Sequence, residues 1–261
     1  MPVQTVFFIH IPKTAGISVN AALRRSGFRA IPMVDGEFAS PPAGLPHFYT
    51  GHYGLSHDIF RRHRGRPYTA FTVIREPVAR MISNYNFTLR RAAAPWHEET
   101  ASGALDLVGL ARNFTTAIGH QYSYFARQAG DPVGVCLENL FNRIHEFGLT
   151  ERIDDLFELL APALGQRVRA TTAKNVTAEI EDNGTRLISR HDVSARQLRE
   201  LTEILAADLW FYENARQEYE RRWNACVDRT GDGGQRYIQN SKSSSVSPGA
   251  SNAAGCAGGS T

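Results

Sequence analysis

The sequence is poor in cysteine and contains no long apolar run. Its three cysteines, Cys136, Cys226 and Cys256, are widely spaced and form no Cys-x-x-Cys pair, which argues against a disulfide framework and against a zinc site. No segment reaches the ~18 consecutive apolar residues of a membrane span. The N-terminal apolar segment has no basic stretch before it and no small-residue cleavage site, so we interpret it as a buried strand. We therefore expect a soluble, cytoplasmic protein.

The chain also has little excess charge. Its 29 basic and 26 acidic residues leave a formal net charge of +3, which is too small to predict nucleic-acid binding but suits a protein that handles small anions. Hydrophobic residues make up 42% and charged residues 21% of the chain. This ordinary globular composition excludes a coiled coil, collagen and wholesale disorder. A length of 261 residues suits one large domain.

Two strand–loop–helix units are predicted in the N-terminal third. Residues Val3–His10 are almost continuously apolar, as in a strand covered on both faces, and a helical pattern follows over Ser18–Arg25. Tyr68–Arg75 is the second strong strand, and Pro77 stands where a helix favours proline. A shorter strand is predicted over His47–His52. This alternation indicates an α/β fold with a P-loop-like parallel sheet flanked by helices.

The C-terminal half is predicted to be mostly helical. Residues 32–46 are rich in proline and glycine and are interpreted as a loop, whereas Glu146–Leu149 is a short strand that joins the sheet. The helices are expected at 104–113, 115–128, 136–146, 151–161, 195–206 and 208–224. We expect one domain over residues 1–228, followed by a disordered Gly/Ser-rich tail over 229–261.

The loop after the first strand has the features of an anion site. A strand that runs through a tight loop into a helix presents free N–H groups and the positive end of the helix dipole to an anion. Lys13 adds a full charge, Thr14 and Ser18 add hydroxyl donors, and Gly16 allows close approach of the backbone. The Gly-x-x-x-x-Gly-Lys-Ser/Thr pattern is absent, which argues against an ATP or GTP hydrolase. The alternative is an ordinary loop with a solvated lysine.

A second anion site is predicted after the second strong strand. Arg75 stands at the carboxyl end of that strand, where ligands of α/β proteins bind. Ser83 lies in the following helix, close enough to share one anion with the arginine fork. The alternative is a surface ion pair between Arg75 and a neighbouring carboxylate such as Glu76.

These two segments resemble the nucleotide-binding motifs of the carbohydrate sulfotransferases. Ile9–Gly16 (IHIPKTAG) resembles their 5′-phosphosulfate loop, and Thr72–Tyr85 (TVIREPVARMISNY) resembles their 3′-phosphate motif. The similarity is greatest to the branch of heparan and uronyl 2-O-sulfotransferases and their soluble bacterial relatives. It implies the donor 3′-phosphoadenosine 5′-phosphosulfate, the product adenosine 3′,5′-bisphosphate and no metal.

The resemblance also implies which residues hold the donor. By position, its 5′ end is held by Lys13, Thr14, Ala15, Gly16, Ile17 and Ser18, and its 3′-phosphate by Arg75 and Ser83. Lys13 is expected to stabilise the charge that develops on the bridging oxygen as the bond to sulfur breaks.

His52 is our candidate for the base that takes the proton of the acceptor hydroxyl. The resembling family carries a His-x-His pair in this stretch, whereas here Thr50 stands at the first position and His52 alone remains. The alternatives are a structural role for His52, with His10, His57 or Glu98 as the base, although His10 is expected simply to end the first strand.

The acceptor is predicted to be a glycan or a glycolipid. Arg90, Arg91, Trp96 and His97 follow the 3′-phosphate helix, and arginines with an aromatic face suit acidic sugars. The alternative is a solvated basic helix end. Two other functions remain open: a nucleoside-phosphate kinase with a degenerate phosphate loop, and a non-catalytic module that binds glycans or anions.

Overall fold

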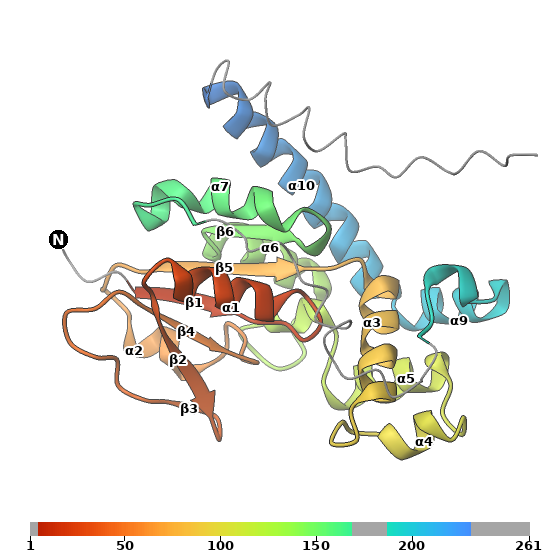
Figure 1. The fold of residues 1–261 in the computed structure, drawn as a ribbon. Helices are drawn as coiled ribbons and strands as arrows, with labels where there is room; N and C mark the ends of the chain where they lie inside the picture. Colours follow the sequence, from red (N-terminus) through yellow and green to blue (C-terminus); the bar gives the residue numbers. More distant parts are fainter. Residues whose placement is uncertain (1–4, 169–186, 231–261) are drawn as a thin grey trace, which may run out of the picture. The chain divides into compact units, whose positions relative to one another are not determined.

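A six-stranded, mostly parallel sheet forms the centre of the structure, a computed structural model that describes residues 5–168 and 187–230 (Figure 1). Its strands are β1 (Thr5–Ile9), β2 (Arg29–Val34), β3 (Glu37–Phe38), β4 (His47–Gly51), β5 (Thr69–Ile74) and β6 (Glu146–Leu149). Their order across the sheet is β3-β2-β4-β1-β5-β6. Every neighbouring pair is parallel except β2 and β3, which form a hairpin.

The register of the central strands brings their carboxyl ends together. Ile9, the last residue of β1, is paired with Gly51 at the end of β4 and with Thr72 near the end of β5. All three strands are almost entirely buried, which explains their continuous apolar sequence. The loops that follow β1, β4 and β5 therefore leave the sheet at one edge.

The helices are α1 (Gly16–Arg25), α2 (Asp58–Arg62), α3 (Pro77–Arg90), α4 (His97–Ala101), α5 (Leu107–Ala117), α6 (Val133–Arg143), α7 (Ile153–Leu164), α9 (Ala195–Ile204) and α10 (Ala206–Thr230). Short 3-10 helices are η1 (Gln121–Phe125), η2 (Thr150–Arg152) and η3 (Arg190–Asp192). Within the described residues, every helix is too short or too polar to span a bilayer.

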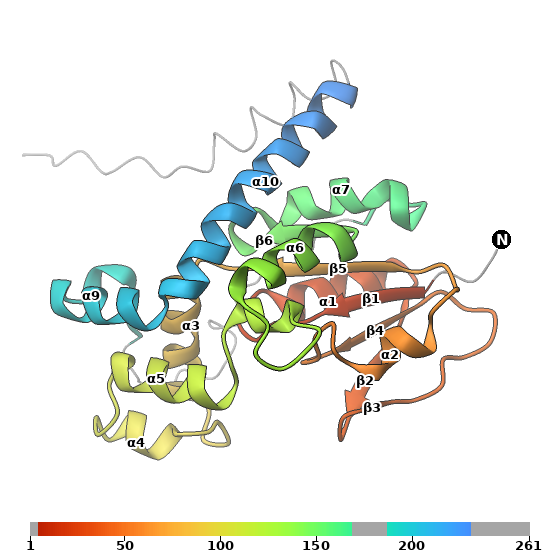
Figure 2. The same ribbon diagram turned by 180° about the vertical axis from the view of Figure 1, so that it is seen from behind.

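Helices cover both faces of the sheet. On one face, α1 and α7 bury an apolar core against β1, β4 and β5 that includes Phe8, Leu23 and Leu156 (Figure 1). On the other face, seen in Figure 2, Phe7 of β1 packs against Phe60 of α2, with 4.9 Å between the ring centroids. The predicted fold class, an α/β sheet flanked by helices with a mostly helical C-terminal half, is confirmed.

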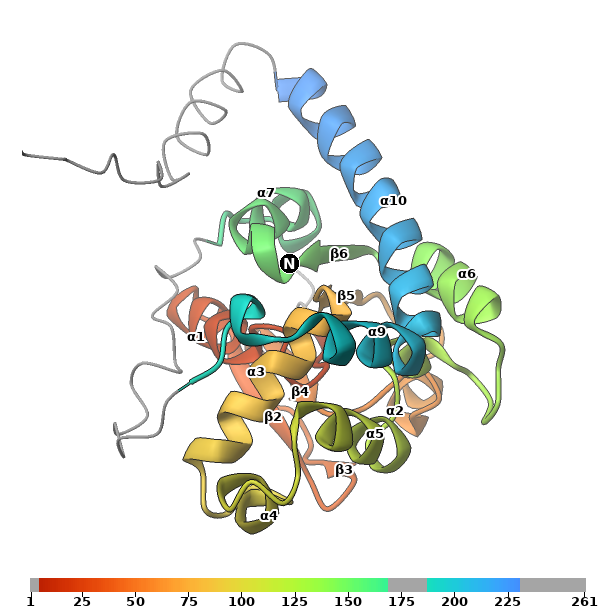
Figure 3. The same cartoon turned by 90° about the vertical axis from the view of Figure 1, so that its right-hand side faces the viewer.

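A group of helices lies beyond the carboxyl edge of the sheet, where Figure 3 views it end-on. Buried residues of α3, α5 and α9, among them Met81, Phe114 and Leu201, form a second apolar cluster there. Pro77 occupies the first turn of α3, and Ser194 and Gln197 form a capping box at the start of α9, both as the sequence predicts. This cluster forms a wall opposite the loops that leave the sheet.

Two sequence-based predictions are wrong. The segment 32–46 is not all loop, because β2 runs through Pro32 to Val34 and turns at Asp35–Gly36 into β3. Both turn residues have positive φ (49° and 81°), as an Asp-Gly hairpin requires. The helix predicted over 115–128 does not form, because α5 runs from Leu107 to Ala117, Gly119 takes a φ of 95° and the 3-10 helix η1 follows.

The chain divides into two compact units, Met1–Arg221 and Arg222–Thr261. The sheet and the helices through α9 belong to the first unit. Of the second, the structure describes only the end of α10. The tail predicted over 229–261 therefore lies almost wholly outside the described residues, and the domain boundary stays a prediction.

Candidate active site

A cleft of about 630 Å³ opens where β4, β1 and β5 end. Loops from these strands line it on one side, and α3, the segment before α4 and the C-terminal part of α5 line it on the other. Most of the residues predicted to hold the donor or to act as base line this one cleft, namely Lys13, Ala15, Gly16, Ile17, Ser18, His52, Arg75 and Ser83. Lys13 and Arg75, which are 62 residues apart in sequence, thus meet at one site. They do so because they follow neighbouring parallel strands, whose carboxyl ends lie at the same edge of the sheet.

The loop between β1 and α1 is held in an unusual backbone conformation. Lys13 and Ala15 have φ values of 70° and 64°, in the left-handed region that non-glycine residues seldom adopt. Thr14 between them is fully buried, and its hydroxyl donates to the carbonyl of Ile11 at 2.8 Å. Unlike the other predicted donor-binding residues, Thr14 therefore directs its side chain into the protein and fixes the loop.

The first turn of α1 leaves its N–H groups available to a ligand. Its N-cap residue is Ala15, and no side chain caps the helix. An uncapped helix N-terminus at the floor of a cleft favours an anion through both its free donors and the helix dipole. Gly16, Ile17 and Ser18, which supply these N–H groups, all line the cleft.

Lys13 and Arg75 lie together in the cleft. The Nη1 atom of Arg75 donates to the carbonyl oxygen of Lys13 at 3.2 Å, and the Nζ atom of Lys13 lies 3.9 Å from the centroid of the Phe87 ring. Within the part of the chain that the structure describes, neither cation forms an ion pair, and Nε of Arg75 is buried without a hydrogen-bond partner. Arg75 is therefore not the surface ion pair that was the alternative interpretation.

The environment destabilises both positive charges. Burial, followed by the charges of Arg75 and Arg91, lowers the pKa of Lys13 to about 8. Burial also lowers the pKa of Arg75, although the carboxylates of Glu151 and Glu76 oppose that shift. Two desolvated cations that form no ion pair among the described residues favour binding of a multiply charged anion in the cleft.

His52 and His10 both line the cleft. The Nδ1–H of His52 donates to the backbone carbonyl of His10 at 2.9 Å, since a carbonyl can only accept. The unshared electron pair of neutral His52 is therefore on Nε2. The two imidazole rings lie 4.6 Å apart. Burial, then His52 and Lys13, lower the pKa of His10 to about 3, so His10 remains uncharged.

The imidazole of His10 also explains the glycine at position 16. A Cβ atom added to Gly16 would lie 1.8 Å from Nε2 of His10. The ring of His10 therefore packs directly on the first turn of α1. The prediction that His10 simply ends the first strand missed this contact, because it depends on the path of the loop and not on local sequence.

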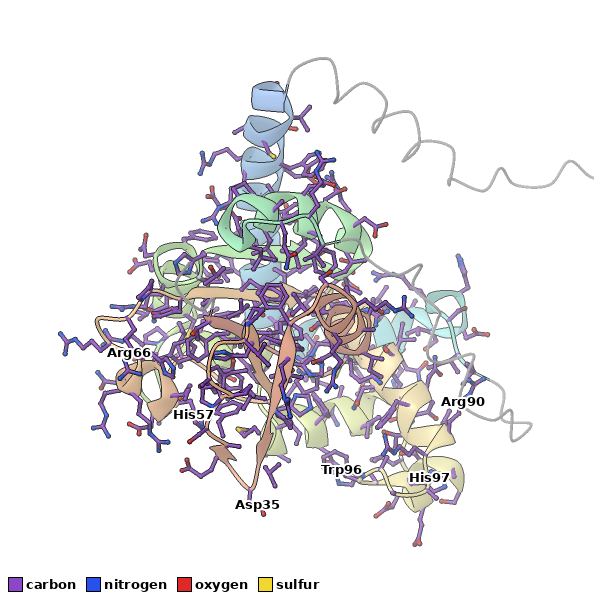
Figure 4. The ribbon with its side chains drawn as sticks, turned by 60° about the vertical axis from the view of Figure 1, so that its left-hand side comes forward. Asp35, His57, Arg66, Arg90, Trp96 and His97 are labelled. Atoms are coloured by element: carbon purple, nitrogen blue, oxygen red, sulfur yellow. The ribbon has the colours of Figure 1, made fainter. Side chains whose placement is uncertain are left out.

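The residues predicted for the acceptor separate in space. Trp96 lines the cleft, whereas Arg90, Arg91 and His97 do not. The Nδ1–H of His97 donates to the carbonyl of Thr88 at 2.7 Å, and the exposed Arg91 has its guanidinium 5.4 Å from the Phe87 ring centroid. Figure 4 shows Trp96 and His97 at the start of α4, with Arg90 on α3.

Two of the three alternative bases, His57 and Glu98, lie outside the cleft. Nδ1 of His57 accepts the N–H of Ile59 and its Nε2–H donates to the carbonyl of Gly36, so both ring nitrogens serve structural hydrogen bonds beside α2 (Figure 4). Glu98 is exposed on α4 and does not line the cleft. Of the two alternative histidines, His10 lines the cleft and His57 does not.

The cleft contains further residues that the sequence analysis did not select. Phe87 follows Ser83 by one helical turn, so the i, i+4 spacing on α3 was a usable signal for it. Phe114, Ile118 and Tyr124 also line the cleft. No local pattern marks these three, because the α3–α5 packing and the turn at Gly119 place them.

The Gly16 contact predicts a specific effect on stability. Gly16→Ala forces the His10 ring to move and is expected to lower the free energy of unfolding by about 1–3 kcal/mol, measured by urea denaturation. The matched control is Gly134→Ala, also in the first turn of a helix but with no atom within 4 Å of the new Cβ, and it should raise stability by about 0.5 kcal/mol. Removing the imidazole (His10→Ala) should cost less in the Gly16→Ala chain than in the wild type. Equal effects of the two glycine substitutions would contradict this packing.

The charge environment of Lys13 predicts an early titration. Lys13, Lys174 and Lys242 are the lysines of the chain, so lysine-specific ¹³C labelling gives three NMR signals, with Lys13→Arg identifying one. We expect that signal to report a pKa of about 8, well below the ordinary lysine pKa of 10.5. Between pH 8 and 10.5 the Lys13 amine is protonated in the unfolded chain but increasingly neutral in the folded chain. The contribution of Lys13 to the free energy of unfolding therefore rises with pH over this range. Three titrations above pH 10 would refute the desolvated environment.

Comparison with known proteins agrees with this geometry. The model of the sulfotransferase family matches residues 2–213, which include the sheet, both loops predicted to bind anions, and helices α3 and α5, which line the cleft. No curated protein matches the chain. Because the family match spans most of the sequence, the chain belongs to the sulfotransferase family.

Proposed function

We propose that this chain transfers the sulfuryl group of 3′-phosphoadenosine 5′-phosphosulfate to a hydroxyl group of a carbohydrate or glycolipid. One observation carries the proposal: Arg75 donates directly to the backbone of Lys13, so the two predicted anion sites belong to one cleft. A donor with phosphate at both ends of one nucleoside needs two cationic sites within the reach of a single molecule.

The residues of the cleft fit such a donor. Lys13 and the first-turn N–H groups of α1 would hold its phosphosulfate end, where the uncapped helix already lacks an acceptor. Arg75 and Ser83 would hold the 3′-phosphate, and the buried, unpartnered Nε of Arg75 offers a donor for it. Thr14 contributes to this site through the loop conformation, since its hydroxyl is used internally.

The same residues account for the transfer step. Nε2 of His52 takes the proton of the acceptor hydroxyl while the oxygen of that hydroxyl forms its bond to sulfur. The bond between sulfur and the bridging phosphate oxygen breaks, and that oxygen keeps the electron pair. Lys13 and the helix N–H groups stabilise the new negative charge, a contribution typically of ~3–4 kcal/mol per donor. The backbone carbonyl of His10 keeps His52 in the tautomer that this role needs.

The acceptor is proposed to bind along the wall opposite the cations. Trp96, Phe114 and Ile118 line the cleft there, and aromatic faces suit the apolar faces of sugar rings. Of the two arginines predicted for acidic sugars, Arg91 lies on the outside next to Phe87. Membership of the heparan and uronyl 2-O branch, and a cytoplasmic location favoured by low cysteine content, belong to this same proposal.

Neither alternative function is favoured by the family. A nucleoside-phosphate kinase or a non-catalytic anion-binding module would also use a cationic cleft, but a member of the sulfotransferase family is expected to transfer sulfate. His52 lines the same cleft as Lys13, and its hydrogen bond to His10 uses Nδ1 and not Nε2, which further supports catalysis over binding alone.

The donor site is tested by calorimetry with adenosine 3′,5′-bisphosphate in the absence of metal. The wild-type chain should bind, and Lys13→Ala and Arg75→Ala should each weaken binding about 10- to 100-fold, since each removes a charge-assisted contact. Arg61→Ala, which removes an arginine 83% exposed on α2, is the matched control and should bind normally. Binding of ATP that requires magnesium, with no binding of the bisphosphate, would support the kinase instead.

The base is tested by comparing two histidines. His52→Ala should lower the turnover number about 10²- to 10⁴-fold with a panel of sugar acceptors and labelled donor, while binding of the donor product stays unchanged. His57→Ala, whose ring nitrogens bond only outside the cleft, should keep its turnover number. Equal activity of His52→Ala and the wild type would remove His52 from the mechanism.

A further inference from the structure

A buried carboxylate of α10 connects the two anion-binding segments without lining the cleft. The side chain of Asp208 is fully buried. Its Oδ2 atom accepts the backbone N–H of Gln121 and its Oδ1 atom accepts that of Tyr122, both at 3.2 Å. Oδ2 also lies 3.7 Å from Nη1 of Arg80 and 3.2 Å from Nδ1 of His120. One acidic group therefore joins α10, α3 and the segment of η1.

The first branch from this carboxylate reaches the loop after β1. Arg80 is fully buried, and its Nε donates to the carbonyl of Pro12 at 3.1 Å. Pro12 lines the cleft directly before Lys13. Burial lowers the pKa of Arg80, and the charge of Asp208 opposes that shift. A guanidinium this deeply buried needs its counterion, so Asp208 keeps Arg80 in the position from which it holds the loop.

The second branch reaches the end of β5. Gln121 is fully buried, and its side chain bonds both backbone groups of Arg75: Nε2 donates to the carbonyl at 3.0 Å, and Oε1 accepts the N–H at 3.3 Å. The backbone of Gln121 is itself fixed by Asp208. The position of the Arg75 backbone therefore depends on the same carboxylate as that of Pro12.

We propose that Asp208 is a positioning residue that sets the Lys13 loop and Arg75 relative to one another, acting through Arg80 and Gln121. The inference rests on the proposed function, because it assigns to this network the spacing between the two phosphate sites. A ligand that binds at two sites loses affinity when the spacing of those sites changes, even though no residue that contacts the ligand is removed. A carboxylate with only a structural role would affect folding but not this spacing.

The first experiment separates positioning from stability. Asp208→Asn keeps the shape of the side chain, removes its charge and should weaken binding of adenosine 3′,5′-bisphosphate about tenfold, measured by calorimetry. The control is Asp155→Asn, which changes another carboxylate with little exposure, bonded to Arg152 and Tyr219, neither of which lines the cleft. It should lower the melting temperature without changing that affinity. Equal affinities of Asp208→Asn and the wild type would overturn the proposal.

A double-mutant cycle gives a second test, which also decides the matter if Asp208→Asn does not fold. Gln121→Met keeps the side-chain volume but removes both bonds to Arg75, so it should weaken binding of the bisphosphate about tenfold in the wild-type chain. In the Arg75→Ala chain the same change should alter the dissociation constant by less than about twofold, because the guanidinium through which Gln121 affects the ligand is already absent. Additive effects would overturn the proposal. No binding by the wild-type chain would instead refute the proposed function.

Discussion

The hydrogen bond from Arg75 to the backbone carbonyl of Lys13 is the contact on which the site depends. It exists because β1 and β5 are parallel neighbours whose carboxyl ends lie at one edge of the sheet. Each strand ends in a loop that carries one cation, so the register of two strands fixes the spacing of two charges. Without that register, the lysine loop and the arginine would be two unrelated surface features.

The cleft carries an excess of positive charge that an anionic ligand would neutralise. Lys13 and Arg75 are both desolvated, and burial is the first cause of the lowered pKa of each. The loop that presents Lys13 also holds two non-glycine residues in the left-handed region, a conformation that costs roughly 1–3 kcal/mol per residue. Such costs are typical of binding sites, because an anion that bridges both cations offsets them.

Buried residues behind the cleft hold the backbone of the two segments that carry these cations. Arg80, Gln121 and Asp208 are fully buried and come from α3, η1 and α10. The hydrogen bonds of the Arg80 and Gln121 side chains end on the backbone of Pro12 and Arg75 and not on any ligand-facing side chain. The neutral His10 plays a comparable part, because its carbonyl orients His52 and its ring packs on Gly16.

The sequence by itself determined the class of the fold and predicted two loops whose residues meet in the cleft, because these depend on local patterns: apolar runs, a proline at a helix start and charged residues after strand ends. It could not determine β2, whose proline and glycine neighbours imitate a loop, or the end of α5 at Gly119. Only the tertiary structure decided that His10 lies against His52, that Thr14 points inward and that Arg90 and His97 miss the cleft. The contact between His10 and His52 joins residues 42 positions apart, and the convergence on Asp208 joins residues as many as 88 positions apart. Packing of whole helices sets such contacts, and no short stretch of sequence encodes it.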